Sequence, residues 1–360
     1  MANPTKAHPD QQQASSNAGA KRSDFRLWPS ENQVQGDEVI RFTSPKTGDL
    51  LYEKDSMLVS ERGENFPVVD GIPRFVASDG YAASFGLEWK IHALTQLDSR
   101  TGTHISQERL ERCIGQPVSE LKGQSVLEAG CGAGRFTELL TKSGALVHAL
   151  DRSVAVEANK GNIGQQPNYV VAQADLLSPP FPPGSFDLVL CLGVLQHTPS
   201  PEASIRALWQ MVKPGGLLVI DHYTWSFSLV TKFAPLYRLF LKGMPPTKSK
   251  KMTDRLVTIF FPLHWRVRNL RPAQMLLSRV SPCLVYLQAF PQLGREQHYE
   301  WCRLDTYDSL TDYYKHLRTP NQIRATLASL NAQDVWVSRG GNGVEARCRK
   351  PGTERELFEG

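Results

Sequence analysis

Apolar runs alternate with amphipathic segments through the middle of the chain, and this alternation predicts its main fold. Five runs have the character of strands: SVLEAG at 125–130, LVHALD at 146–151, YVVAQAD at 169–175, FDLVLCLGV at 186–194 and LLVIDHY at 217–223. Segments with helical spacing lie between them, namely RFTELLTKSG, VAVEANKGNI and PEASIRALWQMV. Nearly continuous apolar strands separated by helices are typical of a parallel sheet that helices cover on both faces.

The regular pattern returns near the end of the chain in a different form. TPNQIRATLASL begins with a capping box, in which Thr319 is the N-cap, Pro320 opens the helix and Gln322 closes the box. VWVSRGGNGVEARCRK, at 335–350, predicts two strands joined by a glycine-rich turn. The predicted fold class is therefore α/β: a Rossmann-like sheet of five parallel strands followed by a terminal antiparallel hairpin.

The segments around this core divide the chain into five predicted parts. Residues 1–36 are rich in Gln, Ser, Asn and Ala and are expected to form a disordered tail. Short β-like runs cut by turn signals at 37–78 predict a small β module of three or four strands. A helical connector opens the core at 79–225, and the core ends at 301–350. The residues between them, 226–300, break the rhythm and are expected to form a helical insertion.

Composition is that of a soluble globular protein, since 41% of the residues are hydrophobic and 21% are charged. The longest apolar run, VSPCLVYLQAFPQLG, has about 15 residues, fewer than the roughly 18–20 that a membrane-spanning helix needs. The N-terminal stretch lacks the apolar segment of a signal peptide. The six cysteines are scattered without a CxxC pair, which argues against disulfides and zinc and predicts a reducing, cytoplasmic location.

Positive charge is concentrated in the insertion. Eleven lysines and arginines lie between Lys232 and Arg279 with a single acid, Asp254, although the net charge of the whole chain is only +5. Apolar clusters such as KFAPLYRLFLKGMP interrupt these cations. Three explanations stay open: a solvated helical face, contact with an anionic membrane surface, or binding of RNA.

A glycine-rich turn follows the first predicted strand in VLEAGCGAGRF, residues 126–136. From Glu128 to Gly134 the spacing is E-x-G-x-G-x-G, whereas dinucleotide sites use G-x-G-x-x-G to place a helix N-terminus under a pyrophosphate. A carboxylate at the strand end suits a cationic cofactor without phosphate, such as S-adenosylmethionine. Asp151 ends the second strand, where it can accept from both ribose hydroxyls, and Asp175 ends the third, where the adenine edge is expected.

This run of features resembles the class I S-adenosylmethionine-dependent methyltransferases. The matching text is VLEAGCGAGRF, ALDRS, AQADLLSPPFPPGSFDLVLCLGVLQH and LWQMVKPGGLLVIDHY. The resemblance implies S-adenosyl-L-methionine as the cofactor and methyl transfer as the reaction. It also implies a cofactor site that contains Glu128, Gly130, Gly132, Gly134, Asp151, Arg152, Asp175, Leu176 and Leu192.

Two flanking segments extend the resemblance. SFGLEW and LDTYDSLTDYYKHLRTP are similar to strings in bacterial methyltransferases with an activator-like module in front, which implies that Phe85 and Trp89 cover the cofactor; plain core aromatics are the alternative. The β module, with its DGIP ending, resembles the small zinc-ribbon-like activator of RNA and protein methyltransferases. A Cys-Pro pair opens that module, whereas Ser44-Pro45 stands here and no cysteine lies in the stretch. We therefore expect no metal, and a docking or structural role.

Methyl transfer needs alignment of donor and acceptor, and an oxygen acceptor with a high pKa also needs a base. His197 and His222 follow or end the fourth and fifth predicted strands, so both are candidate catalytic residues. A structural histidine is the alternative for each. No Asn-Pro-Pro-Tyr-like string follows the fourth strand, which disfavours amide and base-amine acceptors.

The predicted function is O- or N-methylation of a small-molecule, lipid-linked or glycan acceptor. The alternatives are an RNA or protein methyltransferase and, less favoured, a non-catalytic scaffold. Because the insertion interrupts the fold over the carboxyl ends of the strands, we expect it to form the lid of the acceptor site. Its charge predicts an anionic or membrane-associated acceptor and peripheral contact with an anionic membrane, with nucleic acid less favoured.

Overall fold

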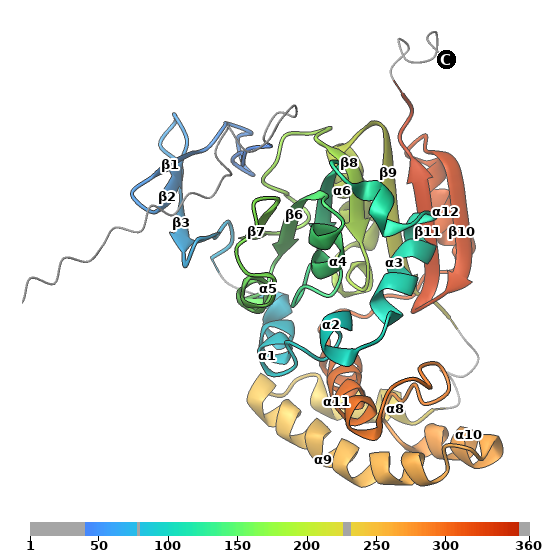
Figure 1. Ribbon diagram of the computed structural model, residues 1–360. Coiled ribbons are helices and arrows are strands. Elements are labelled where there is room, and N and C mark those ends of the chain that lie inside the picture. The colour runs from blue at the N-terminus through green and yellow to red at the C-terminus, as the bar shows by residue number, and fades with distance from the viewer. Residues whose placement is uncertain (1–39, 78–79, 226–231, 353–360) are drawn as a thin grey trace, which may run out of the picture.

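The computed structural model describes residues 40–77, 80–225 and 232–352. The predicted disordered tail lies outside these residues. Figure 1 shows a small β module, a large central sheet with helices on both faces, and a cap of helices below the sheet. The central sheet has seven strands in the order β10-β11-β9-β8-β5-β6-β7.

Five strands of the central sheet are parallel, and the last two form an antiparallel hairpin along one edge. The strands are β5 (Ser125–Ala129), β6 (Leu146–Asp151), β7 (Tyr169–Gln173), β8 (Phe186–Cys191), β9 (Val212–Tyr223), β10 (Gln333–Gly340) and β11 (Gly343–Arg349). The hairpin joins the sheet through β11, which pairs with β9. The predicted fold class is confirmed, including the hairpin.

Neighbouring side chains of β5 show how the sheet divides the core. Val126 packs in a cluster with Leu110 and Leu140, whereas Leu127 packs with Leu208 and Leu327 on the opposite face. The helices of the first face are α3 (Ile105–Ile114), α4 (Thr137–Lys142) and α5 (Ala155–Ile163), and those of the second are α6 (Pro201–Met211) and α12 (Pro320–Ala328). Burial on both faces accounts for the continuous apolar strands in the sequence.

The helix α12 begins with the predicted capping box. The N–H of Gln322 donates to Oγ1 of Thr319 at 3.3 Å, and the N–H of Thr319 donates to Oε1 of Gln322 at 2.8 Å. The box satisfies backbone donors that the first helical turn would otherwise leave without partners. The sequence therefore located the start of this helix correctly.

The β module is an antiparallel sheet of four short strands, in agreement with the predicted three or four. The strands are β1 (Tyr52–Lys54), β2 (Met57–Val59), β3 (Asn65–Val69) and β4 (Ile72–Pro73). Backbone hydrogen bonds attach the module to the central domain: Thr43 N–H donates to Pro180 at 2.9 Å, and Phe75 N–H donates to Gln173 at 2.8 Å. The module thus continues directly onto the edge of the large sheet.

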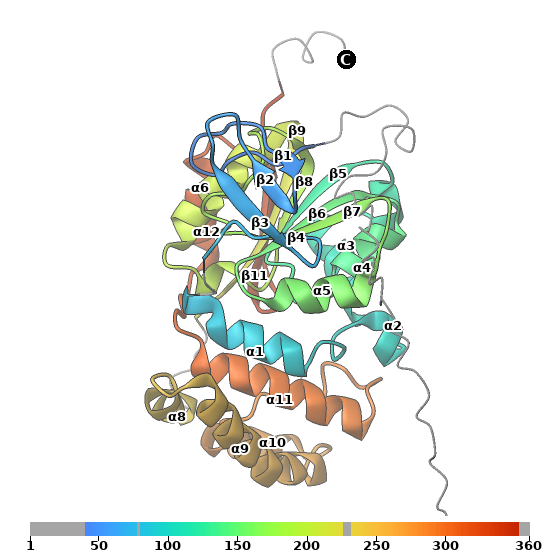
Figure 2. The ribbon, with the colours of Figure 1, turned by 90° about the vertical axis from the view of Figure 1, so that its left-hand side faces the viewer.

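A cap of helices covers the end of the sheet at which the parallel strands finish (Figure 2). Its members are α1 (Ala83–Ile91), α2 (Asp98–Thr101), α8 (Ala234–Leu241), α9 (Pro246–Arg266), α10 (Arg271–Val280) and α11 (Arg295–Thr311). In Figure 2, α1 lies directly below the sheet, α11 lies below α1, and α8, α9 and α10 lie farthest away. The predicted boundary between residues 300 and 301 falls inside α11.

None of the helices in the described part of the chain combines the length and the apolar character that crossing a membrane requires. All six cysteines are buried and free. They belong to several separate parts of the core, so the scattered spacing in the sequence corresponds to scattered positions in space. Two pairs share an apolar cluster: Cys283 and Cys302 in the cap, and Cys191 and Cys348 in the central domain.

Candidate functional site

The glycine-rich loop lies at the carboxyl end of β5 and is held by hydrogen bonds to β6. The N–H groups of Gly130 and Cys131 both donate to the carbonyl oxygen of Leu150, at 2.7 and 3.0 Å. The N–H of Gly132 donates to Oδ2 of Asp151 at 3.0 Å. The fold therefore brings the predicted cofactor residues of two strands together.

The glycines of this loop are required by space as well as by backbone conformation. A Cβ on Gly130 would lie 2.2 Å from Cγ2 of Val194, and a Cβ on Gly132 would lie 3.1 Å from the ring of Trp89. The φ angles of Gly130, Gly132 and Gly134 are 84°, 49° and 101°, a region that favours glycine. Trp89, from α1, thus covers the loop closely.

Glu128 ends β5 as a buried carboxyl group. Only 3% of the residue is exposed, and its Oε2 accepts a hydrogen bond from Oγ1 of Thr137 at 2.6 Å. Burial raises the pKa of Glu128 to about 8, and the hydrogen bond from Thr137 opposes this only in part. A positive charge beside such a group would favour its ionised form. The site therefore suits a cationic cofactor.

The other two predicted acids lie in more polar surroundings. Oδ1 of Asp151 accepts from both the N–H and the Oγ of Ser153, at 2.8 Å each. Asp175 forms an ion pair with Arg152. The guanidinium of Arg152 lies 5.0 Å from the ring centroid of Tyr81, which belongs to the short helix η1 (Gly80–Ala82). The segment before α1 therefore joins the predicted cofactor residues as well.

The remaining predicted cofactor residues are apolar. Leu176 and Leu192 are buried, in core clusters on opposite faces of the sheet. Phe85, from α1, lies edge-on to the imidazole of His197, with the ring centroids 5.1 Å apart. Through Phe85 and Trp89, the helix α1 contacts both the glycine loop and one of the predicted catalytic residues.

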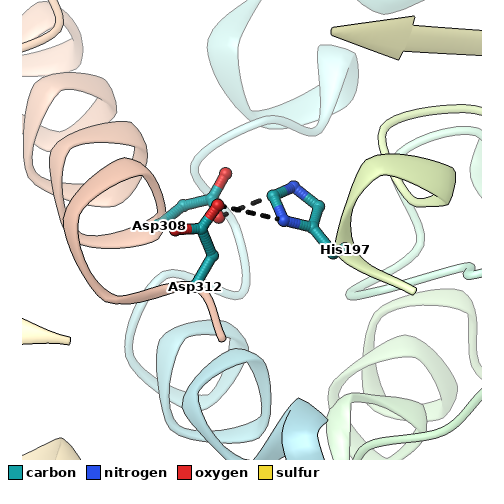
Figure 3. Close-up of side chains that lie close together, drawn as sticks. All are labelled: His197, Asp308 and Asp312. Atoms are coloured by element: carbon teal, nitrogen blue, oxygen red, sulfur yellow. Dashed lines mark ion pairs between the residues drawn. The ribbon is translucent and has the colours of Figure 1, made fainter. Parts of the chain in front are cut away.

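His197 lies in η3 (Leu195–His197), beyond the end of β8, and points toward α11 (Figure 3). Its Nδ1 lies 3.2 Å from the carbonyl oxygen of Tyr314 and 3.2 Å from Oδ2 of Asp312. Since a carbonyl accepts only, Nδ1 carries the hydrogen and Nε2 carries the lone pair. Nε2 lies 3.8 Å from Oδ1 of Asp308 and makes no hydrogen bond within the described residues.

The surroundings of His197 favour its neutral form. Burial lowers the pKa of His197, with a further contribution from Lys315, while Asp308 acts in the opposite direction. The ring of Tyr223 stands edge-on to the imidazole, and its hydroxyl donates to Oδ2 of Asp308 at 3.3 Å. A neutral imidazole with a lone pair on Nε2 can accept a proton.

His222 is separated from this group. Side chains alternate along β9, so that Asp221 and Tyr223 share one face and His222 lies on the other. The Nδ1 of His222 lies 2.8 Å from the carbonyl oxygen of Tyr223. Burial lowers the pKa of His222 to about 4, and Arg318 adds to the effect. The fold thus brings only one of the two predicted histidines to the cap.

Acidic residues of α11 and of the position directly after it form part of the site and were not identified from the sequence as site residues. Asp305, Asp308 and Asp312 have the helical spacing i, i+3 and i+7 and share one face. Burial and the charge of Asp308 raise the pKa of Asp305 to about 7. Glu88, from α1, is also buried, and the same two causes raise its pKa well above the usual value. The acidic spacing in LDTYDSLTD was the available signal.

Two partly buried arginines were also missed. Arg109, in α3, forms an ion pair with Asp221, whose Oδ1 accepts from the N–H of Gly193 at 2.6 Å. Arg135 follows the glycine loop, and its Nε donates to Oγ of Ser106 at 2.9 Å. Burial lowers the pKa of Arg135 to about 9. They supply positive charge beside the loop: Arg135 lies within the stretch VLEAGCGAGRF, and Arg109 lies in none of the stretches that carry the resemblance.

The three side chains in Figure 3 also have the composition of a metal-binding group. His197, Asp308 and Asp312 each offer one ligand atom, and these atoms lie within 4.8 Å of one another. The sequence predicted no such cluster, because His197 is far along the chain from Asp308 and Asp312. Asp312 is already paired with Arg238, and Lys315 lies 3.6 Å from it. These cations oppose the binding of a divalent ion and favour a role of the carboxylates toward the imidazole.

The middle of the chain is similar to known methyltransferases. Residues 127–220 match the family described as "Methyltransferase domain". Ubiquinone biosynthesis O-methyltransferase of Pseudomonas putida is 34% identical over 134 residues, which are 36% of this chain and 54% of the relative. The enzyme of the same name from Xanthomonas euvesicatoria pv. vesicatoria is 38% identical over 106 residues, 28% of this chain and 44% of the relative. The chain spans about half the length of the curated relatives it matches.

Solved structures give a weaker likeness. The magnesium protoporphyrin IX methyltransferase ChlM from Synechocystis PCC 6803, with bound SAH, is 16% identical, and the match covers 75% of this chain and 95% of that chain with a TM-score of 0.41. The family match and the strand order agree with the predicted class I methyltransferase domain and its cofactor, S-adenosyl-L-methionine.

Proposed function

We propose that the chain is an S-adenosylmethionine-dependent O-methyltransferase of a small-molecule acceptor, with His197 as the general base. The methyltransferase domain at 127–220 and the names of the curated relatives support the class of reaction. The match covers only about half the length of those relatives. The class of acceptor therefore follows from the side chains around His197 in this chain.

The donor end of the site consists of the carboxyl groups and the glycine loop. The raised pKa of Glu128 and the close fit of Gly130 and Gly132 support a cationic cofactor held against the backbone. Asp151 and Asp175 lie at the strand ends where ribose and adenine are expected, with Arg152 and Tyr81 beside Asp175. When bound, the cofactor supplies a methyl group that its sulfonium activates.

The observation that carries the proposal is the state of the His197 imidazole. Its hydrogen is on Nδ1, which faces the carbonyl oxygen of Tyr314 at 3.2 Å, and its Nε2 makes no hydrogen bond within the described chain. An acceptor hydroxyl that reaches Nε2 can pass its proton there as the oxygen attacks. Burial keeps the imidazole neutral beforehand, because it lowers the pKa.

The carboxylates of Asp308, in α11, and of Asp312, directly after it, position and stabilise this base. Asp312 lies 3.2 Å from Nδ1, where it favours the same tautomer as the Tyr314 carbonyl. Asp308 lies 3.8 Å from Nε2, close enough to stabilise the imidazolium that forms when the proton arrives. In our proposal both act through His197 and not on the acceptor itself. Tyr223 holds Asp308 in place through its hydroxyl.

We further propose that the acceptor is apolar apart from its reacting hydroxyl and comes from a membrane. Phe85 and Tyr223 each place an aromatic ring edge-on to His197. The cap beyond α11 combines positive charge with exposed apolar side chains, which suits an anionic surface that carries such an acceptor.

The β module has a structural role in this proposal. Ser44 is buried, and its Oγ accepts from the N–H groups of Lys46 and Thr47, at 3.2 Å each. A turn that is closed by hydrogen bonds needs no metal at this position. The ammonium of Lys160 donates to the carbonyl oxygens of Asp70 and Gly71 at 2.7 and 2.9 Å, which supports docking of the module against α5.

The proposal is tested by comparing two histidine variants. His197→Asn should lower kcat by about 10²–10⁴-fold and leave the dissociation constant of S-adenosylmethionine unchanged. His222→Asn is the matched control, because His222 is another buried neutral histidine near the same strand ends, on the opposite face. Equal losses of kcat in both variants, or a normal kcat in His197→Asn, would remove His197 from the mechanism.

A further inference from the structure

The layer of the cap farthest from the sheet exposes an unusual number of apolar side chains. Of the seventeen exposed large apolar residues in the described part of the chain, eleven lie between Phe233 and Val280. Leu239 and Phe240 of α8 are 75% and 71% exposed, and Leu276 of α10 is 66% exposed. In α10, no residue is buried at all. Exposed apolar surface of this extent marks a binding surface on a soluble domain.

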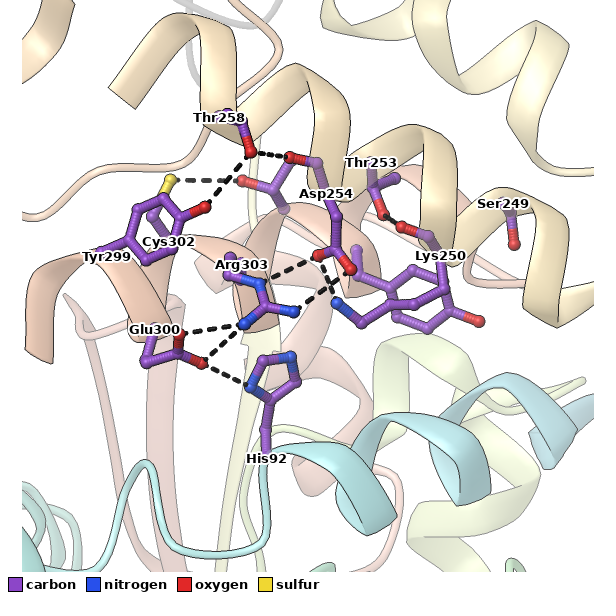
Figure 4. Close-up of polar contacts among 12 residues, drawn as sticks. His92, Ser249, Lys250, Thr253, Asp254, Thr258, Tyr299, Glu300, Cys302 and Arg303 are labelled. Carbon is purple, nitrogen blue, oxygen red and sulfur yellow. Dashed lines mark hydrogen bonds and ion pairs between the residues drawn. The ribbon is translucent and has the colours of Figure 1, made fainter. Parts of the chain in front are cut away.

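Ion pairs attach the inner face of this layer to the rest of the cap, so the layer packs as an ordered part of the fold. Asp254 of α9 forms ion pairs with Lys250 of its own helix and with Arg303 of α11 (Figure 4). Arg303 also pairs with Glu300, which lies 3.4 Å from His92, at the end of α1. Three helices are joined by this network, and it uses the only acid between residues 232 and 279.

The outer face keeps its positive charges without partners. Lys248, Lys251 and Arg255 are exposed on α9, and Arg271 and Arg279 are exposed on α10. None of these five forms an ion pair with another described residue. Their charges are therefore available to an external anionic group, next to apolar side chains that are available to an apolar one.

We propose that the outer face of α8, α9 and α10 docks on an anionic lipid bilayer. An amphipathic helix lies in the membrane interface with its apolar side chains below the headgroups and its cations among the anionic phosphates, and this face offers both kinds of side chain. Leu239, Phe240 and Leu276 would enter the apolar boundary, and Lys248, Lys251 and Arg255 would meet the headgroups.

The kind of side chain distinguishes a bilayer from the other partners that a basic surface could bind. Single-stranded RNA is bound by aromatic rings that stack on bases, whereas most of the exposed apolar residues here are aliphatic, such as Leu239, Ile259 and Met275. A second copy of the chain would bring two cationic faces together, which repulsion opposes. A lipid bilayer satisfies the aliphatic and cationic groups together.

Docking bears on the proposed function, because the acceptor is proposed to come from a membrane, but docking itself does not depend on methyl transfer. The docking face lies on the side of α1 and α11 away from the sheet (Figure 2). The cap would therefore rest on the bilayer while the cofactor loop stays on the other side of α1. A lipid-soluble acceptor would approach His197 from the side of the cap that rests on the bilayer.

The test is flotation of the full chain with vesicles of phosphatidylcholine alone or with phosphatidylglycerol added. We expect binding to the mixed vesicles only, and weaker binding at high salt. Lys248→Glu, Lys251→Glu and Arg255→Glu together should weaken it at least about tenfold. Leu239→Ser with Phe240→Ser should weaken it as well, because the apolar contacts are lost.

The matched control is Lys54→Glu, Lys122→Glu and Arg206→Glu, which changes the net charge equally at exposed positions outside the cap and should leave flotation unchanged. The dissociation constant of S-adenosylmethionine serves as the measure of folding and of the proposed function, and should be unaltered in every variant. Equal flotation of the cap variant and the control would overturn the docking proposal. Tighter binding to a single-stranded RNA probe than to the vesicles would also overturn it.

Discussion

The carbonyl oxygen of Tyr314 lies 3.2 Å from Nδ1 of His197, although 117 positions separate the two residues in the chain. The segment that contains Tyr314 leaves α11 and returns to the sheet. Its backbone N–H groups donate to η3 and to β9, from His316 to Gln196 at 2.9 Å and from Arg318 to Tyr223 at 2.9 Å. The tautomer of the proposed base is therefore set by the connection between cap and core.

The acid side of the pH–rate profile should report the pKa of His197. Because burial lowers this pKa below the usual 6.5, the midpoint of the fall in kcat on acidification, at saturating cofactor, should lie below pH 6.5. Lys315→Met should move the fall to higher pH, since the positive charge of Lys315 also lowers the pKa. Asp308→Asn should move it to lower pH. Movement of both variants in the same direction would contradict the assignment.

Cofactor binding should be linked to a proton on Glu128. Burial raises the pKa of Glu128 to about 8, so the carboxyl group of the free protein is largely protonated at pH 7. A cationic donor favours the carboxylate, so binding should release a proton, and affinity should rise between pH 6 and 8. Calorimetry at pH 7 in buffers of different ionisation enthalpy measures this release. Glu128→Gln should show none.

The same pKa shift affects stability without ligand. The folded pKa of about 8 lies above the usual 4.5, so between these values the folded state holds a proton that the unfolded state releases. The contribution of Glu128 to stability is therefore largest below pH 4.5 and is lost as the pH rises to 8. Glu128→Gln should gain in free energy of unfolding over the natural protein across this range, by ~2 kcal/mol or more. A constant difference in urea unfolding at pH 5 and pH 8 would disprove the burial of an ionisable Glu128.

Gly130 should not tolerate a methyl group. In Gly130→Ala the new Cβ would meet the side chain of Val194 at 2.2 Å, and the backbone would carry a φ of 84°. We expect a loss of ~1–3 kcal/mol in stability and a weaker affinity for S-adenosylmethionine. Adding Val194→Ala removes the closest atoms and should recover part of both losses. If the double variant recovers neither stability nor affinity, the contact with Val194 is not the cause of the losses.

Chelation should leave the activity unchanged. The carboxylates of Asp308 and Asp312 lie beside His197. Asp312 is paired with Arg238 and lies near Lys315, so these two cations already balance the negative charge of the carboxylates. Dialysis against EDTA should preserve kcat, and elemental analysis should find less than one metal ion per chain. Stoichiometric metal that EDTA removes together with activity would contradict this and would make His197 a ligand and not a base.

The strands and the cofactor loop were predictable because local rules decide them. Continuous apolar runs identified the parallel strands, and the capping box at Thr319 and Gln322 located α12. The resemblance of SFGLEW to related proteins predicted that Phe85 and Trp89 cover the cofactor; the ring of Trp89 lies close to Gly132, and the cover over the cofactor stays a prediction. The strands, the loop and the start of α12 depend on short segments whose conformation neighbouring residues set.

The acceptor side was harder to predict because it is built by contacts between distant segments. The acids Asp305, Asp308 and Asp312 carry a helical period, but nothing in the sequence says which helix or loop they face. The separation of His197 from His222 was easier to predict from the sequence. In a strand, the side chain of His222 must lie on the opposite face from those of Asp221 and Tyr223. Which of the two faces contains the acceptor site depends on where the cap packs, and the sequence does not give this.

The central claim is methyl transfer from S-adenosylmethionine to an oxygen of a small, apolar acceptor. It is tested most directly by incubating the full chain with methyl-labelled S-adenosylmethionine and a cell extract, then separating lipid, glycan, RNA and protein fractions. We predict label in the organic-solvent extract, carried on oxygen in a small molecule, and its loss in His197→Asn but not in His222→Asn. Label confined to RNA or protein, or equal labelling by the natural protein and His197→Asn, would contradict the claim.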